Sequence, residues 1–576
     1  MNTVIRGCFT ILLVATGVAL SSSGTGTGPA SREVGITSRY LLFPVAAADK
    51  DRVKVRLVSN GTVIRYFDID VAEQGTTPLY WASLDVGRWK GTTVRLECEA
   101  PSILDAIMAV LEQGDRPRFP EDLYREPRRP QFHFSPRLGW TNDPNGLAFL
   151  DGEYHLFFQH NPYGINWGNM TWGHAVSRDL VRWEEIGDAL HPDELGTIYS
   201  GSGVVDHKNT SGLQKGSVPP LVVFFTSAGG HSYQKAPYTQ SMAYSTDRGR
   251  TWTKYAGNPV IPHIAGTNRD PKVFWHESTR QWIMVLYLER GRFRLFSSNN
   301  LKDWKRLSDV DFPDGHECPE LFPLPVDGDA ANTRWVMWEG GGRHLIGRFD
   351  GTQFTAETGV LASEWGSNSY AAQTWNDVPD GRQLLIAWMR HRPQAGEPPA
   401  YQGMPFNQQM TFPRVLSLRS TPEGVRFFAE PAAEITKLYQ RRHNVKPGPL
   451  KPGENPLSAI RGELFDIESD LEVGRATSLE LRIRGTPVVY NAASHELSCL
   501  GRSVKLAGVD DRLQLRVLVD RTSVEVFAAG GRYVMSLCFN PDPADRSLAL
   551  SAAGGAATIK SFYVRELKSA WGGAAR

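Results

Sequence analysis

The sequence predicts an all-β protein of several domains. Short apolar or β-branched runs alternate with tight turns, and Asp151-Gly152, Asp350-Gly351 and Asp380-Gly381 lie between such runs as two-residue hairpin turns do. Long helical periodicity is missing from the central region. Because a chain of 576 residues is too long for one ordinary domain, we expect several separate β cores.

The first residues have the features of an export signal. Arg6 precedes an apolar run from Cys8 to Leu20, and Ala19-Leu20-Ser21 offers a small-residue cleavage point. The run is shorter than the roughly 20 apolar residues of a membrane span, and no later segment approaches that length. We expect a signal peptide over residues 1–22, a flexible leader rich in Ser, Gly and Thr over 23–36, and a secreted or periplasmic protein without a membrane span.

Residues 37–115 predict a small N-terminal β domain that resembles a sandwich. Its runs alternate with period two, and Asn60-Gly61 and Lys90-Gly91 supply turns between them. Ser102 to Glu112 is a candidate for one short helix. Residues 116–131 are rich in proline and charge without a hydrophobic period, so we expect a linker or strap there.

A weak repeat within residues 132–430 predicts the blades of a β-propeller. Ser177–Trp183, Ser245–Trp252 and Ser298–Trp304 each follow a strand, turn on Asp or Asn and end on a tryptophan. Recurrence at roughly 50 to 70 residues suits blades with variable loops, because one blade takes about 40 to 50 residues. A sandwich gives no reason for such a repeat.

The C-terminal part predicts a second sandwich. Residues 431–452 are bounded by prolines and are expected to be a linker, and residues 453–570 form the predicted C-terminal β-sandwich. Alternation in Leu513–Asp520 and in Ser523–Phe527 predicts two neighbouring antiparallel strands.

Composition narrows the class of partner. Lys and Arg total 63 against 62 Asp and Glu, so the chain lacks the excess of positive charge that is typical of proteins that bind nucleic acid or anionic membranes. A neutral partner fits this balance better. The five cysteines show no Cys-x-x-Cys or Cys/His spacing, so we expect no metal and no cofactor. Cys499 and Cys538 could pair, although separate buried thiols are the favoured alternative.

The stretch Gly139–Trp183 has the composition of a carbohydrate site. It combines an aspartate in an Asp-Pro-Asn-Gly turn, a Gln-His-Asn-Pro turn and four tryptophans. Sugars offer hydroxyls to carboxylates and amides and C–H faces to flat rings. A loop-rich β domain that uses Asn, Gly and Pro only in its turns has the same composition, so both interpretations stay open on this stretch alone.

Three acidic residues stand in more informative motifs. Asp143 lies in WTNDPNG, Asp270 in NRDP and Glu317 in HECPE. A proline follows both aspartates and predicts an extended backbone at each. Since a propeller gathers the inner strand of every blade around one axis, acids far apart in sequence can converge in one funnel. Cleavage of a glycosidic bond needs such a pair of carboxyl groups.

These motifs, in this order, resemble the signature of the glycoside hydrolase family 32 fructan hydrolases, which include levanases, inulinases and invertases. The QHNP and WGHAVS segments and the C-terminal VDRTSVEVF stretch resemble the family as well. The resemblance implies a five-bladed β-propeller followed by a C-terminal β-sandwich. The N-terminal domain lies outside the usual family core and more weakly resembles an extra domain of some bacterial levanases.

The same resemblance implies roles for the acids. Asp143 matches the nucleophile, Glu317 the general acid/base and Asp270 a transition-state stabiliser. We expect the pKa of Glu317 to be raised by a neighbouring carboxylate and a partly dry pocket. A retaining mechanism places the nucleophile and acid carboxyl groups about 5 to 5.5 Å apart. The residues implied to line the first fructose site are Asn142, Gln159, Trp167, Tyr199, Ser200 and Arg269.

Other residues near these motifs have alternative interpretations. For Trp167 and Tyr199, packing inside a blade is equally compatible with the sequence. Trp338 and Trp388 are candidates for the pocket rim, although a core position is favoured. Asn368 and Ser369 replace an Asp and a Phe of a similar family segment, which puts linkage specificity in doubt.

We predict a secreted retaining β-fructosidase acting on a fructan polysaccharide or fructo-oligosaccharide, with exo-hydrolysis of levan or inulin favoured. Endo-levanase and sucrose-cleaving invertase activities are the alternatives within the family. An inverting arabinanase-type glycosidase would hold its carboxyl groups about 6.5 to 9.5 Å apart. A non-catalytic fructan-binding protein is disfavoured because all three acids are present.

Overall fold

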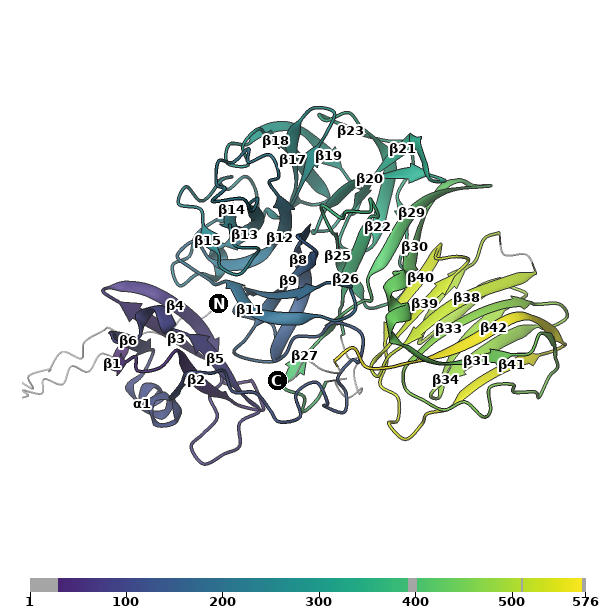
Figure 1. The fold of residues 1–576 in the computed structure, drawn as a ribbon, viewed down its shortest axis with the longest axis horizontal. Coiled ribbons are helices and arrows are strands. Elements are labelled where there is room, and N and C mark those ends of the chain that lie inside the picture. Colours follow the sequence, from purple (N-terminus) through teal and green to yellow (C-terminus); the bar gives the residue numbers. More distant parts are fainter. Residues whose placement is uncertain (1–28, 392–400, 509–510, 572–576) are drawn as a thin grey trace, which may run out of the picture.

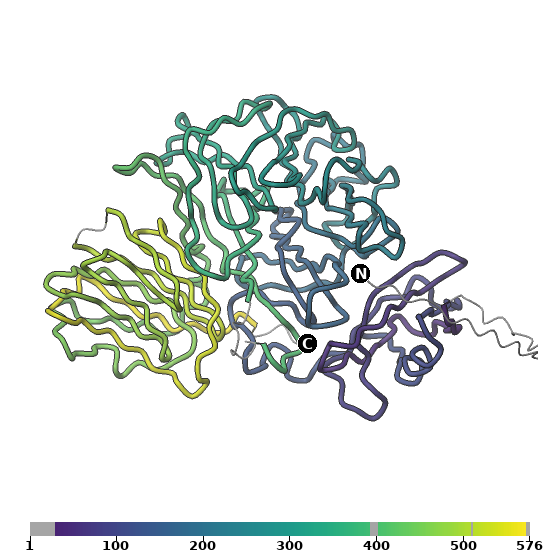
Figure 2. Tube along the Cα trace, turned by 180° about the vertical axis from the view of Figure 1, so that it is seen from behind, coloured from purple at the N-terminus to yellow at the C-terminus, as the bar shows by residue number. Residues whose placement is uncertain are grey.

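The computed structural model describes residues 29–391, 401–508 and 511–571. Figure 1 shows three β units, with the N-terminal domain and the C-terminal sandwich on opposite sides of a central propeller. The view from behind in Figure 2 shows the same arrangement. The all-β fold class expected from the sequence is confirmed. The predicted signal peptide, residues 1–22, lies outside the described residues.

The N-terminal domain consists of two small sheets and one helix. The first sheet has the order β1 (Ala30–Gly35), β6 (Thr93–Cys98), β3 (Val53–Ser59), β4 (Thr62–Ile69). The second has the order β5 (Tyr80–Asp85), β2 (Tyr40–Val45), β7 (Glu112–Gly114). The 3-10 turn η1 (Gly87–Trp89) precedes β6, and the helix α1 spans Pro101–Val110, so the short helix expected at Ser102–Glu112 is present with slightly earlier ends.

One boundary of this domain differs from the expectation. The flexible leader expected over residues 23–36 is wrong in its second half, because Ala30–Gly35 forms β1 and pairs antiparallel with β6. Val34 is the one buried residue of this strand, so the segment lacks the period-two alternation that would have revealed it in the sequence.

The propeller has five blades of four main strands each within the described residues. The first three are separate sheets, and the last two are joined by a single parallel pair between Val326 and Leu418. Blade 1 contains β8 (Gly139–Leu150), β9 (Glu153–Asn161), β10 (Thr171–Ser177) and β11 (Glu184–Leu190). Blade 2 contains β12 (Thr197–Val205), β13 (Leu221–Ala228), β14 (Tyr238–Ser245) and β15 (Thr253–Lys254), with η2 (Gly229–His231) after β13. Blade 3 contains β16 (Arg269–His276), β17 (Gln281–Glu289), β18 (Arg292–Ser298) and β19 (Lys305–Asp311).

The last two blades carry short extra strands. Blade 4 contains β20 (Glu320–Val326), β21 (Asp329–Trp338), β22 (Arg343–Phe349) and β23 (Phe354–Ala356), with β24 (Leu361–Ala362) beside β22. Blade 5 contains β25 (Ser369–Thr374), β26 (Leu384–Met389), β29 (Arg414–Thr421) and β30 (Gly424–Pro431), with β28 (Gln409–Met410) beside β26. The strand β27 (Phe406–Asn407) pairs with β8, so the loop after β26 is tied to the first blade.

The repeat seen in the sequence is the turn between the third and fourth strands of blades 1 to 3. In blades 1 and 3 an acid or amide side chain accepts hydrogen bonds from backbone N–H groups two and three residues later: Asp179 at 3.2 and 2.8 Å and Asn300 at 3.0 and 2.9 Å. In blade 2, where the turn is one residue longer, Asp247 accepts from those three and four residues later, at 3.1 and 2.9 Å. In blade 4, Asp350 makes the same turn as Asp179, and Phe354 stands in place of the tryptophan. Of the three turns predicted as two-residue hairpins, Asp151-Gly152 is confirmed and the other two are wrong, because four residues separate β22 from β23 and nine separate β25 from β26.

The C-terminal sandwich begins earlier than expected. Its larger sheet contains β31 (Tyr439–Val445), β42 (Ala557–Leu567), β33 (Phe465–Glu472), β38 (Arg512–Val519), β39 (Ser523–Ala528) and β40 (Tyr533–Cys538), with β32 (Gly448–Leu450) beside β42. The smaller sheet contains β37 (Arg502–Lys505), β36 (Glu496–Cys499), β35 (Thr486–Asn491), β34 (Ser478–Ile483) and β41 (Leu548–Ala553). The linker expected over residues 431–452 is therefore wrong, because η3 (Ala433–Leu438) leads directly into β31 and β32, which both pair with β42.

Buried charges join the propeller to the sandwich. The carboxylate of Asp520 accepts hydrogen bonds from the backbone N–H groups of Gln131, Phe132 and His133 at 2.8, 2.9 and 3.2 Å and from the His133 ring at 2.8 Å. Glu525 contacts the other ring nitrogen of His133 at 2.8 Å and forms an ion pair with Arg414. The expected strap of residues 116–131 thus ends in a fixed contact with the C-terminal domain.

In the ranges described, no helix has the length and apolar character that crossing a membrane requires. Cys98, Cys318, Cys499 and Cys538 are free thiols, so Cys499 and Cys538 do not pair.

Candidate active site

All nine residues expected at the site line one cavity of about 420 Å³ on the propeller. They come from blades 1, 2 and 3 and from the loop before β20. The complete lining is Asn142, Asp143, Gln159, Trp167, Met170, Tyr199, Ser200, Tyr238, Thr267, Arg269, Asp270, Glu317, Tyr370, Trp388 and Arg390. The convergence that the propeller hypothesis required is therefore present.

Irregular strand pairing aims these side chains at the cavity. The first strands of four blades, β8, β12, β16 and β25, each lose their register at the cavity. The shifts fall between Thr141 and Pro144, Ile198 and Gly201, Arg269 and Lys272, and Tyr370 and Gln373. A bulge lets adjacent residues point to the same side of a strand. Neighbours such as Tyr199 and Ser200 therefore both reach the cavity.

Asp143 is held by two side-chain donors. Ser200 Oγ donates to Asp143 Oδ2 at 2.6 Å, and Asn142 Nδ2 donates to Oδ1 at 3.1 Å. Trp140 Nε1 donates to Asn142 Oδ1 at 2.9 Å and so fixes the amide. Burial raises the pKa of Asp143, although both hydrogen bonds favour its ionised form. Its orientation is thus set before any substrate arrives.

Asp270 lies deeper, with 5% of its surface exposed. The backbone N–H of Cys318 donates to its Oδ2 at 3.1 Å, and Thr226 Oγ1 accepts from its own N–H at 2.9 Å. The extended backbone expected before Pro271 is wrong at this position, because Asp270 has a φ of 64° inside the bulge. Burial raises the pKa of Asp270 to about 7, with Arg269 opposing the rise and Glu317 and Asp143 adding to it.

Glu317 is engaged by an arginine and a tyrosine. Arg269 Nε donates to its Oε2 at 2.9 Å, a second guanidinium nitrogen donates to the same oxygen, and the Tyr370 hydroxyl donates to Oε1 at 2.9 Å. Burial opposes ionisation, but the Arg269 charge and these hydrogen bonds outweigh it and hold the pKa of Glu317 below its ordinary value. The raised pKa expected for Glu317 is therefore wrong for this arrangement, because the expectation did not include Arg269 as its direct partner.

Cys318 separates the two aspartates. Its Sγ lies 3.6 Å from Asp143 Oδ2 and 3.4 Å from Asp270 Oδ2, so its one thiol hydrogen can be donated to either carboxylate. Burial raises the pKa of this thiol well above its ordinary range, which keeps it neutral. Cys318 therefore acts as a small neutral side chain between the two acids.

Aromatic rings form the remaining walls. Trp167 is 45% exposed and its ring centroid lies 6.2 Å from that of Tyr199, so it is not packed inside a blade. Trp388 lines the cavity although it is largely buried, whereas Trp338 packs in the core against His344. Gln159 Oε1 is buried without a hydrogen-bond partner among the described residues, which leaves an acceptor for a hydroxyl group.

Five lining residues were not predicted at the site: Met170, Tyr238, Thr267, Tyr370 and Arg390. A sixth, Trp388, was a candidate for the pocket rim for which a core position was favoured. Tyr370 lies two residues after Asn368, in the segment whose departure from the family was noted. Asn368 itself does not line the cavity. Its side chain donates to the Arg390 carbonyl oxygen at 2.8 Å and accepts from the Cys538 N–H at 2.9 Å. The similarity of the segment around Asn368 to a family segment was the feature of the sequence from which Tyr370 could have been predicted.

Within the described ranges, no group of three His, Cys, Asp or Glu side chains is arranged to hold a metal ion. The cavity instead combines paired carboxyl groups, hydroxyl and amide donors and an exposed indole. This donor set fits a neutral polyhydroxylated ligand and a reaction that needs both an acid and a nucleophile.

Comparison with known proteins decides the family. Residues 133–431 match the family model for the glycosyl hydrolases family 32 N-terminal domain, and residues 434–566 match the one for the glycosyl hydrolases family 32 C terminal. A levanase from Bacillus subtilis (strain 168) is 39% identical over 495 residues, which cover 78% of this chain and 72% of the levanase. The chain belongs to glycoside hydrolase family 32.

Two further relatives support the assignment to family 32. An extracellular exo-inulinase from Aspergillus niger is 31% identical over 524 residues, which cover 78% of this chain and 96% of the inulinase. The crystal structure of an exo-inulinase from Aspergillus awamori has a TM-score of 0.69 at 31% identity and covers 78% of this chain and all of that chain. The resemblance drawn from the motifs is confirmed, and the chain is a glycoside hydrolase. Both matched family 32 ranges start after the N-terminal domain.

Proposed function

We propose that this family 32 enzyme hydrolyses β-fructofuranosidic bonds in fructans, with retention of configuration, and releases fructose from chain ends. The observation that carries the proposal is the presence of Asp143, Asp270 and Glu317 in one cavity with every residue expected to bind fructose. The relatives described as levanase and exo-inulinase support fructan as the substrate and exo-hydrolysis as the preferred mode.

Asp143 is the proposed nucleophile. Its carboxylate attacks the anomeric carbon while Glu317 gives a proton to the leaving oxygen, so a fructosyl ester forms on Asp143 and the shortened chain leaves as an alcohol. Glu317 then takes a proton from water, whose oxygen breaks the ester and releases fructose. Asp270, which lines the same cavity as Asp143 and Glu317, is proposed to bind fructose hydroxyls and stabilise the positive charge of the transition state.

Arg269 is proposed to control the proton of Glu317. Productive chemistry requires Glu317 to be protonated, whereas its hydrogen bonds to Arg269 and Tyr370 favour the carboxylate. Hydroxyl groups of a bound fructose unit compete for the same guanidinium. We infer that substrate weakens the contact between Arg269 and Glu317, which raises the pKa of Glu317 at the moment a proton is needed.

The other contacts fit a single fructose unit beside Asp143. Gln159 offers its free carbonyl oxygen and Asn142 its amide, while Trp167 presents an exposed ring to the C–H face of the sugar. Ser200 already holds Asp143 and is proposed to keep the nucleophile in place rather than to bind sugar strongly.

The proposed function is tested by incubating the protein with levan, inulin and sucrose and resolving the products by size over time. Fructose as the first product supports exo-hydrolysis, whereas an early ladder of oligosaccharides contradicts it. Retention is measured by NMR from the anomer that is released first.

Replacement of Asp143 by Asn should lower turnover by about 10⁴-fold or more while the protein stays folded, since the nucleophile is lost. Asp329→Asn is the matched control, because Asp329 is exposed at the end of a hairpin in blade 4. Substantial hydrolysis by Asp143→Asn would contradict the assignment of the nucleophile.

We also propose that the protein is exported. The expected signal over residues 1–22 and the extracellular exo-inulinases among the relatives support this. Expression of the full chain should give a protein outside the cytoplasm whose mass lacks the first residues, and full-length protein retained in the cytoplasm would contradict it.

A further inference from the structure

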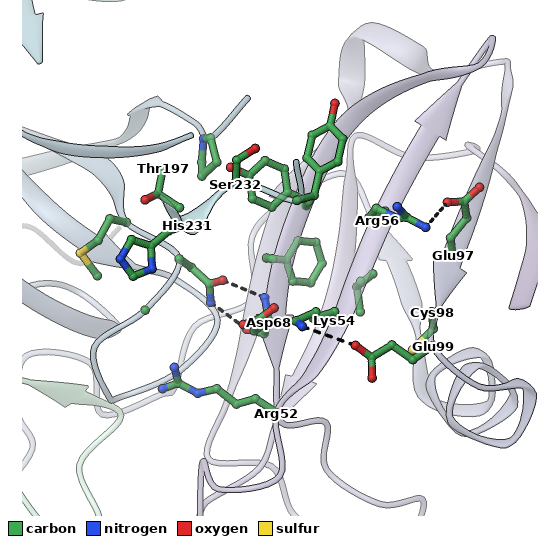
Figure 3. A pocket seen from close by; sticks show the side chains of 18 of the residues that line it. Arg52, Lys54, Arg56, Asp68, Glu97, Cys98, Glu99, Thr197, His231 and Ser232 are labelled. Carbon is green, nitrogen blue, oxygen red and sulfur yellow. Dashed lines mark hydrogen bonds and ion pairs between the residues drawn. The ribbon is translucent and has the colours of Figure 1, made fainter. Parts of the chain in front are cut away.

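A second cavity, of about 500 Å³, lies between the N-terminal domain and the propeller. Figure 3 shows Arg52, Lys54, Arg56 and Asp68 of the N-terminal domain on one side, and Thr197, His231 and Ser232 of blade 2 on the other. Its volume falls within the range of about 300 to 1,000 Å³ that is typical of pockets for small ligands.

The second cavity adjoins the candidate active site. Trp167 and Met170 line both cavities. The strand β12 also serves both, because Thr197 lines the second cavity while Tyr199 and Ser200 line the first. A chain bound at Asp143 therefore needs only to pass Trp167 to enter the space between the domains.

The N-terminal domain holds the wall between the two cavities. Arg52 donates to the carbonyl oxygens of Trp167 at 3.0 Å and Asn166 at 3.1 Å. Asn169 accepts from the backbone N–H of Asp68 and donates to its carbonyl oxygen, both at 2.7 Å. At Gly168, a Cβ atom would lie 2.6 Å from the Arg52 guanidinium, so a larger residue there would displace Arg52. The cavity is thus a defined space with fixed walls.

Two polar groups in the second cavity lack a partner. Thr197 is 6% exposed, and its hydroxyl has no hydrogen bond within the described residues. The carboxylate of Asp68 forms no hydrogen bond or ion pair in the same ranges, and burial raises its pKa. Buried polar groups are normally paired, so the Thr197 hydroxyl points to a ligand in this cavity. The half-buried Asp68 carboxylate, which lines the same cavity, is free to accept hydrogen bonds from such a ligand.

The remaining lining favours a neutral ligand with apolar faces. Arg56 and Lys54 form ion pairs with Glu97 at 3.1 Å and Glu99 at 3.6 Å, so their charges are already balanced. Rings from both domains meet in the wall, with the centroids of Tyr66 and Tyr233 5.1 Å apart. Aromatic rings beside unpaired hydroxyl and carboxylate groups are what a sugar chain requires.

We propose that the cavity between the N-terminal domain and blade 2 is a distal subsite that binds further fructose units of the chain whose cleaved unit lies at Asp143. The proposal rests on the proposed function and deepens it, since it makes the N-terminal domain part of the binding surface for long fructans. Asp68 accepts hydrogen bonds from the distal units and Thr197 donates one to them.

The test compares a long fructan with a fructosyl trisaccharide, which offers only two units beyond the one that is cleaved at Asp143. The variants are Asp68→Ala in the N-terminal domain and Thr197→Val in blade 2. Asp105→Ala and Thr239→Val are the matched controls, because Asp105 is exposed on α1 and the buried hydroxyl of Thr239 also lacks a partner but lines neither cavity. The readout is the ratio of kcat/KM for the long fructan to kcat/KM for the trisaccharide.

We expect this ratio to fall about tenfold in Asp68→Ala and about threefold in Thr197→Val, as the loss of a charged and of a neutral hydrogen bond implies. The two controls should leave it unchanged. An unchanged ratio in both test variants would overturn the subsite, as would equal losses on both substrates, which indicate damage to the fold or to the active site.

Binding gives a second measurement that does not depend on turnover. In the Asp143→Asn background, addition of Asp68→Ala should weaken binding of the long fructan about tenfold and should leave trisaccharide affinity within about twofold. Equal affinity of both backgrounds for the long fructan would overturn the subsite. If the unaltered protein hydrolyses no fructan at all, the proposed function fails, whereas hydrolysis without this chain-length dependence refutes the subsite alone.

Discussion

The hydrogen bond from Tyr370 to Glu317 should set the alkaline limit of activity. The hydroxyl donates to Glu317 Oε1 at 2.9 Å and so favours the carboxylate over the acid that catalysis requires. Removal of the donor in Tyr370→Phe favours the protonated form and raises the pKa of Glu317. Because kcat/KM reports the ionisations of the free enzyme, its alkaline limb should move to higher pH.

The size of the shift follows from the environment. A hydrogen bond to a charged group contributes about 1.5 to 3 kcal/mol. The Glu317 side chain is 28% exposed and retains Arg269 as a partner, so the lower end of that range applies. A difference of about 1.4 kcal/mol corresponds to about one pKa unit. We therefore expect the alkaline limb of Tyr370→Phe to lie about one pH unit higher.

The assay is the pH profile of kcat/KM for a fructosyl trisaccharide, measured for the unaltered protein, Tyr370→Phe and a matched control. Tyr439→Phe is that control, since the Tyr439 hydroxyl donates to Asp466 at 2.5 Å in the C-terminal sandwich and does not line the cavity. The reasoning is refuted if the alkaline limb of Tyr370→Phe stays in place or moves to lower pH while the protein remains folded.

Three further predictions concern the nucleophile and the domain junction. Ser200→Ala removes the 2.6 Å hydrogen bond to Asp143, so the acidic limb of kcat/KM should move to higher pH and the rate should fall about tenfold; an unchanged acidic limb would count against this contact. Asp520→Asn should destabilise the protein by about 3 to 5 kcal/mol in chemical unfolding, because the buried ion pair with His133 is lost and an amide NH2 replaces one of the two oxygens that accept from backbone N–H groups; a loss below about 1 kcal/mol would contradict it. Burial lowers the pKa of His133, but its contacts with Asp520 and Glu525 raise it to about 9, so the free energy of unfolding should fall as pH rises from about 6.5 through 9. The pKa of Glu525 is held at about 2, so the free energy of unfolding should also fall as pH drops from about 4.5 towards 2. A series of thermal melting measurements that shows no change in either pH window would refute both statements.

Local chemistry explains what the sequence predicted well. The Ser177–Trp183 repeat was visible because one side chain, Asp179, determines its turn through hydrogen bonds to residues two and three positions later. Such a turn needs no information from distant parts of the chain. The acids were recognised for the same reason, since Asp143, Asp270 and Glu317 each lie in a short motif that can be read without knowledge of the fold.

The features that the sequence did not predict depend on contacts between distant segments. The φ of 64° at Asp270 arises where β16 loses register with β17. The sequence of one strand alone does not determine its register with its neighbour. The lowered pKa of Glu317 depends on Arg269, 48 residues earlier in the chain. The sequence predicts a linker where β31 and β32 form, because their partner, β42, lies more than 100 residues away. Tertiary contacts decided each of these features.

The family motif VDRTSVEVF illustrates the same distinction. Its position far from the catalytic acids gave no indication of its role in the sequence. In the structure its Asp520 and Glu525 bind His133 from both sides, at the point where the chain enters the propeller. This part of the family signature therefore serves the junction between domains rather than the active-site cavity.

The two flanking domains each fix one wall of the active-site cavity. Arg52 of the N-terminal domain holds the loop that carries Trp167, through the carbonyl oxygens of Asn166 and Trp167. On the other side, Asn368 accepts from the N–H of Cys538 in the sandwich and donates to the Arg390 carbonyl, which positions the segment that carries Tyr370. The side chain of Asn368, which stands where similar family members have an Asp, thus bonds to the backbone of Arg390 and to the sandwich and does not line the cavity.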